Sequence, residues 1–99
     1  MPNAAQFSKM RLEYLKELFP KVYRHMEKQG TLAQHLSQVG QEADEMWRDL
    51  EAQMLTAPDL PENYLDRVAR LESIPEIVRE LVTRELIYVP PPQSRRQIG

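Results

Sequence analysis

Side chains of the types that carry catalysis are present in this 99-residue sequence, but they follow no catalytic pattern. Neither His25 nor His35 has a second histidine or an acid at the one-turn spacing of a helical metal site. Cysteine is absent, so disulfides, thiolate metal sites and cysteine catalysis are excluded. No serine lies in a nucleophile-elbow context, and the three glycines are too scattered for a phosphate-binding loop. We therefore predict a protein that is not an enzyme and that uses no metal or cofactor.

The acidic residues are the next candidates for chemistry, because they are unevenly distributed. Residues 1–30 have a charge balance of +3, residues 31–60 of −5, and residues 61–99 of zero. Carboxylate pairs at one-turn spacing, such as Glu45 and Asp49, are common on exposed helices and indicate no catalysis without a cleft. A solvated helix face is the simplest interpretation of the acidic middle. Its alternative role is to contact a protein partner, and the candidate residues are Glu42, Glu45 and Asp49, with Arg95 and Arg96 near the C-terminus.

One stretch, "TLAQHLSQVGQEADEMW" (Thr31–Trp47), resembles a DNA-binding helix-turn-helix, with Gly40 at the turn. A turn should reset the apolar phase, yet Val39 and Ala43 on either side of Gly40 belong to the same seam. The second half is also acidic, whereas DNA affinity comes from Lys and Arg that displace counterions. We therefore predict one continuous helix here. If the protein binds DNA, the basic first segment would do so, through Lys9, Arg11, Lys16, Lys21, Arg24 and Lys28.

Apolar residues recur at spacings of three and four along most of the chain, and no stretch alternates as a strand does. The fold class is therefore predicted as all-α, a small antiparallel bundle of three long helical runs, kinked or broken near Pro20 and Pro75. Capping boxes are predicted at Asn3–Gln6 and Thr31–Gln34. Ser73 would cap a new helix segment before Pro75. The bundle domain should span residues 1–89, with a flexible tail over residues 90–99 that contains prolines and arginines.

The N-terminus has no apolar stretch of signal-peptide length, and no run approaches the roughly 20 apolar residues of a membrane span. We expect a cytoplasmic protein that does not enter a membrane.

Three blocks together resemble a known family. They are "YLKE" (Tyr14–Glu17), "GTLAQHLSQVGQEADEMWRDLEAQM" (Gly30–Met54) and "RELVTRELIY" (Arg79–Tyr88). The chain is similar to the TnpV-type proteins encoded on bacterial transposons and conjugative elements. It departs from the family at Val39, where isoleucine is usual, and at the prolines Pro20 and Pro75. The resemblance implies a mobile-element setting and supplies no catalytic residues.

Three functions follow from these observations. The leading hypothesis is a non-catalytic accessory protein of a bacterial mobile genetic element that binds a protein partner, from the recombination machinery or from host defence. An inhibitor of a host-defence nuclease, comparable to an anti-CRISPR protein and using the acidic helix, is one alternative. An excisionase-like DNA-binding accessory factor that uses the basic first segment is the other, and the acidic middle disfavours it.

Overall fold

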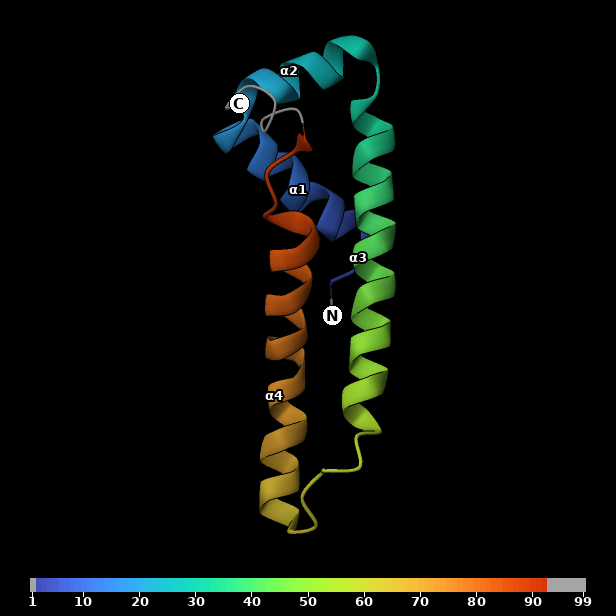
Figure 1. Cartoon of the computed structure of the whole chain (residues 1–99), viewed down its shortest axis with the longest axis vertical. Helices are drawn as coiled ribbons and strands as arrows, with labels where there is room; N and C mark the ends of the chain where they lie inside the picture. The colour runs from blue at the N-terminus through green and yellow to red at the C-terminus, as the bar shows by residue number, and fades with distance from the viewer. Residues whose placement is uncertain (1, 93–99) are drawn as a thin grey trace.

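The computed structural model describes residues 2–92, which contain helices and no strand (Figure 1). The predicted all-α class is therefore confirmed. In chain order the elements are α1 (Ala4–Leu18), α2 (Pro20–Gln29), α3 (Leu32–Leu55), α4 (Tyr64–Val82) and one turn of π-helix, η1 (Thr83–Ile87). The predicted count of three runs and their antiparallel arrangement are not confirmed. The first run is divided into two helices, and α2 lies across one end of the molecule.

The start of α1 follows the predicted capping box. The backbone N–H of Gln6 donates to Asn3 Oδ1 at 2.9 Å, and the backbone N–H of Asn3 donates to Gln6 Oε1 at 2.8 Å. Two donors that a helix end would leave unpaired are thus satisfied. The helix ends at Phe19, and Pro20 occupies the first turn of α2, where its missing N–H has no cost. The predicted break near Pro20 is therefore confirmed.

The second helix ends at Gly30, whose φ of 75° lies in the left-handed region that glycine adopts without strain. The predicted Thr31–Gln34 capping box is wrong. Thr31 has φ −102° and ψ −7°, a near-helical conformation rather than the extended one of a capping residue. Its hydroxyl instead donates back to the carbonyl of Met26 at 3.4 Å.

The third helix runs without interruption through Gly40, so the helix-turn-helix is excluded and the continuous helix is confirmed. Gly40 is buried where α1 crosses α3. A Cβ on Gly40 would lie 2.5 Å from the carbonyl oxygen of Ala4 and would also clash with Ser8 Oγ. Ser8 Oγ donates to the carbonyl of Leu36 at 2.7 Å, which fixes the crossing. Gly40 is therefore required by a close helix–helix contact.

The fourth helix continues through Pro75, so of the break or kink predicted there the break is wrong. Ser73 does not cap a helix start, because its hydroxyl donates to the carbonyl of Arg70 one turn earlier at 2.7 Å. Proline removes one helical hydrogen bond, but Ile74 and Val78 on either side of it are buried in the core. This packing holds the helix together. Its last turn widens into η1, in which the Tyr88 N–H donates to the Thr83 carbonyl at 2.7 Å.

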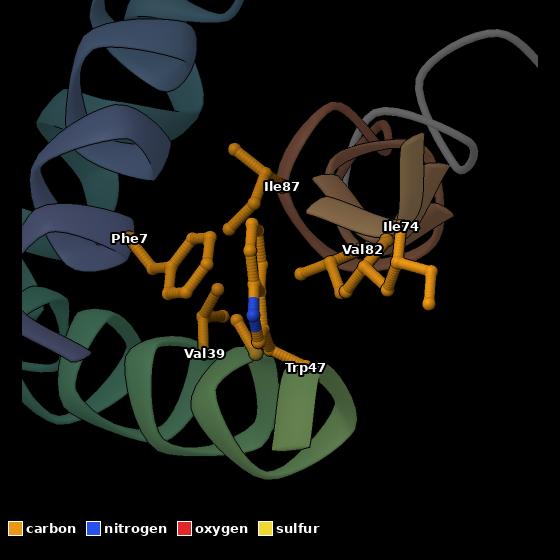
Figure 2. Close-up of a cluster of buried hydrophobic side chains, with 8 residues drawn as sticks. Phe7, Val39, Trp47, Ile74, Val82 and Ile87 are labelled. Carbon is orange, nitrogen blue, oxygen red and sulfur yellow. The ribbon is translucent and has the colours of Figure 1, made fainter. Parts of the chain in front are cut away.

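The main core surrounds Trp47. Figure 2 shows its ring rising from α3 between Phe7 on one side and Val82 and Ile74 of α4 on the other. The Phe7 and Trp47 ring centroids are 6.0 Å apart, and both side chains are almost fully buried. The members of this cluster come from all elements except α2: Phe7, Val39, Ala43, Trp47, Ile74, Val78, Val82 and Ile87. A second, smaller cluster of Leu15, Val22 and Met26 fixes α2 against α1.

The molecule is long and thin, with extents of 55 × 27 × 19 Å. We call residues 2–40 and 83–92 the head, and residues 41–82 the arm, which is the hairpin of α3 and α4 that projects from the head (Figure 1). The head has seven basic and four acidic residues, a balance of +3, and the arm has four basic and eleven acidic residues, a balance of −7. The charges of the chain are thus separated along its long axis.

Candidate functional site

The predicted partner-binding acids lie together on the solvent face of α3. Glu42, Glu45 and Asp49 are all exposed, and spacings of three and four residues place them on one side of the helix. Gln38 Nε2 donates to Glu42 Oε1 at 3.1 Å. The one arginine of this segment, Arg48, instead pairs with Asp44 at 3.1 Å. Among the described residues, no basic side chain neutralises this face.

The fourth helix carries a second acidic stripe that the sequence analysis did not single out. Glu72, Glu76 and Glu80 recur at intervals of four residues, and all three are exposed. In the sequence, Glu76 and Glu80 form one more carboxylate pair at one-turn spacing, and such pairs are common on exposed helices. The arm therefore presents two separate acidic surfaces, one on each helix.

The basic residues proposed for DNA binding are divided between two helices. Lys21, Arg24 and Lys28 lie on one exposed face of α2, opposite the buried Val22 and Met26. Lys9 and Lys16 are exposed on α1, and Lys16 Nζ lies 5.5 Å from the centroid of the Tyr23 ring. The exposed basic surface is therefore concentrated on α2.

Arg11 is a correction to the sequence analysis, because it is not on the surface. Only 3% of the residue is exposed. Its Nη1 donates to the carbonyls of Ile87 at 2.9 Å and of Val89 at 2.5 Å. Its guanidinium carbon lies 5.5 Å from the centroid of the Tyr14 ring. Arg11 thus binds the C-terminal end of η1, where the last carbonyls of a helix attract a cation.

His35 is the third partner of this buried arginine. Arg11 Nε donates to His35 Nε2 at 3.3 Å, so this nitrogen acts as an acceptor and His35 is neutral. Burial lowers the pKa of His35, the positive charge of Arg11 lowers it further, and Glu42 opposes both effects. Burial also lowers the pKa of Arg11. His25, by contrast, is exposed on α2. The Arg11–His35 pair therefore joins α1, α3 and the C-terminal segment, and its role is structural.

Arg95 and Arg96 lie outside the described residues. Within residues 2–92, no three His, Asp or Glu side chains gather in a way that could hold a metal ion. The helices of this part of the chain are also too short or too polar to cross a bilayer. Pro91 is fully buried.

The geometry defines a class: a small all-α protein with a packed head and a charged two-helix arm. The sequence model of one family, transposon-encoded protein TnpV, matches residues 2–87 of this chain. The chain therefore belongs to the TnpV family, as its resemblance indicated. No curated protein and no solved structure matches it.

Proposed function

We propose that this TnpV-family protein is a non-catalytic accessory protein of its transposon, and that it acts by binding a basic protein partner through the acidic face of α3. One observation carries the proposal: Glu42, Glu45 and Asp49 share an exposed face on which the described residues provide no basic side chain. Such a face attracts a positively charged partner and fixes its register. Proteins that bind DNA have basic surfaces, so the recombination proteins of the same element are the first candidates.

The test measures capture of the element's own recombinase by the immobilised chain. The variant Glu42→Gln/Glu45→Gln/Asp49→Asn removes the three charges and keeps similar side-chain volumes. The control Glu72→Gln/Glu76→Gln/Glu80→Gln makes the same charge change on the exposed stripe of α4. We expect the α3 variant to lose capture and the α4 control to keep it. Equal loss in both variants would indicate attraction by overall charge and would contradict a defined site.

DNA binding is the second candidate, and the exposed basic face of α2 favours it. Lys21, Arg24 and Lys28 present three positive charges on one side of a short helix. If they contact phosphates, a mobility-shift assay on element-end DNA should show an affinity that falls steeply with salt. Changing all three to Gln should reduce that salt dependence. No shift of wild-type protein at low salt would exclude this function.

A further inference from the structure

Among the described residues, four of the six large exposed apolar side chains lie towards the two ends of the molecule. At the end of the arm, Tyr64 is 76% exposed, Leu65 74% and Leu55 47%. At the other end, Leu18 is 63% exposed where α1 meets α2. Single exposed leucines are ordinary on a protein surface, but apolar side chains that gather in one place mark sites of interaction.

The junction of α1 and α2, which we call the elbow (Leu18–Val22), contains a hollow of about 190 Å³. Its lining is mostly apolar and consists of Leu18, Phe19, Pro20, Lys21 and Val22. An apolar cavity of about 150 Å³ in another protein accommodates benzene. The hollow is therefore large enough for one leucine or tyrosine side chain from outside.

Charge distinguishes the two ends and makes them complementary. The elbow is flanked by Lys21 and Arg24, both exposed. The arm end has Glu62 and Asp66, which are exposed and form no ion pair with a described residue, against one exposed cation, Arg67, while Asp59 pairs with Arg70. Opposite charges around apolar contacts are the arrangement of a specific interface, with an apolar centre and a polar rim.

We propose that two copies of this chain pair side by side in antiparallel orientation, with the arm end of each copy seated in the elbow of the other. Leu65 fills the hollow and Tyr64 packs beside it, while Glu62 and Asp66 face Lys21 and Arg24. Figure 1 shows the α3–α4 loop at one end of the long molecule and α2 across the other end. The antiparallel orientation brings these unlike ends together twice.

The same charges exclude the competing arrangement, in which two arms pack against each other. Each arm has a charge balance of −7, so arm-to-arm pairing would bring like charges together. A two-fold axis also uses the elbow contact twice, which doubles the buried area and closes the assembly. The same contact without the axis would generate an open chain of copies.

The test measures the mass and dissociation constant of the purified chain by sedimentation over a range of concentrations and salt. We expect a dimer that dissociates on dilution and more readily at high salt. Both the elbow variant Lys21→Glu/Arg24→Glu and the arm variant Glu62→Lys/Asp66→Lys should raise the dissociation constant at least about tenfold, because each turns attraction into repulsion. The control Glu72→Lys/Glu76→Lys, which makes the arm variant's charge change away from the arm end, should change it by less than about threefold. Helical circular dichroism checks that each variant is folded.

Mixing the elbow variant with the arm variant is the decisive experiment. In a mixed pair, the reversed elbow meets the reversed arm end, and the two unchanged ends meet each other. The mixture should therefore form a dimer within about threefold of the wild-type constant. A wild-type chain that stays monomeric, a mixture that pairs no better than either variant alone, or an assembly larger than two copies would each overturn the proposal. This test needs no recombinase or DNA, so its outcome is independent of the proposed function.

Discussion

The head and the arm share one helix, α3, and the burial of its residues changes at the base of the arm, after Trp47. As far as Trp47, α3 is crossed by α1 and packs against η1, and Val39, Gly40, Ala43 and Trp47 are buried. Along the rest of the arm it packs against α4, and no residue from position 48 to position 73 is buried. The periodic apolar pattern is similar in both halves. The difference shows that the number of neighbouring helices, more than the pattern itself, decides how much apolar surface leaves the solvent.

The largest expected effect tests this difference in burial. Trp47→Ala removes a side chain that is 1% exposed at the base of the arm, and should lower the free energy of unfolding by about 3–5 kcal/mol. Leu65→Ala removes one that is 74% exposed at the arm end of a single chain. At concentrations at which the chain is monomeric, this change should stay within about 0.5 kcal/mol. Urea unfolding followed by circular dichroism measures both.

Because Trp47→Ala could leave too little folded protein to measure, Phe7→Leu provides a milder change to the same ring contact. Its cost should lie between those of the other two variants. In the monomeric chain, a Leu65→Ala variant as damaging as Trp47→Ala would mean that the arm end packs against this chain's own helices, and would contradict the difference in burial.

A smaller effect sharpens the comparison within α3 itself. Alanine is favoured over glycine in a helix by about 1 kcal/mol, so Ala52→Gly in the exposed part of the arm should destabilise by that amount. At Gly40 the same preference for alanine should be outweighed, so that adding a methyl group lowers the stability. The new Cβ meets the Ala4 backbone, and overpacking of this kind costs about 1–3 kcal/mol, more than the helical gain.

Gly40→Ala should therefore destabilise as well, and the check is thermal or urea unfolding of both variants under the same conditions. A stabilised Gly40→Ala variant would show that α1 and α3 are farther apart in solution than the structure has them.

The sequence was sufficient to predict most features that depend on neighbouring residues, although the equally local Thr31–Gln34 capping box was wrong. The capping box of Asn3 and Gln6, the break at Pro20 and the continuity of α3 each follow from side chains within one or two turns. It failed where distant contacts decide. Pro75 and Ser73 looked like a helix start, and only the packing of Ile74 and Val78 keeps α4 whole.

The candidate functional residues also divide into those that local spacing places correctly and those that distant contacts decide. Spacing alone placed Glu42, Glu45 and Asp49 on one exposed face. Arg11 was misplaced, because its acceptors on Ile87 and Val89 lie more than seventy residues away along the chain. An arginine among other basic residues gives no local signal of burial. A histidine on the seam side of α3 was the nearest hint, since a half-buried imidazole needs a hydrogen-bond partner.

The smallest expected effect is the loss of folding stability at acidic pH. Burial and the charge of Arg11 hold the pKa of His35 below its ordinary value of 6.5. Between pH 6.5 and that lower folded-state pKa, the unfolded chain takes up a proton and the folded chain does not. Acid therefore favours unfolding, and stability that is fully present above about pH 6.5 should decline as the pH falls. This loss of stability should arise in the head, because protonation of His35 removes the acceptor of Arg11 Nε and places a second cation beside Arg11.

Urea unfolding of wild type and of His35→Gln between pH 8 and pH 5.5 measures this effect. Glutamine can accept a hydrogen bond from Arg11 but takes up no proton, so the variant should lose less stability over this range. His25→Gln, on the exposed face of α2, is the matched control and should retain the wild-type slope. Equal slopes in wild type and His35→Gln would mean that the Arg11–His35 contact does not distinguish the two protonation states. The buried Arg11 would then not make the head more sensitive to acid.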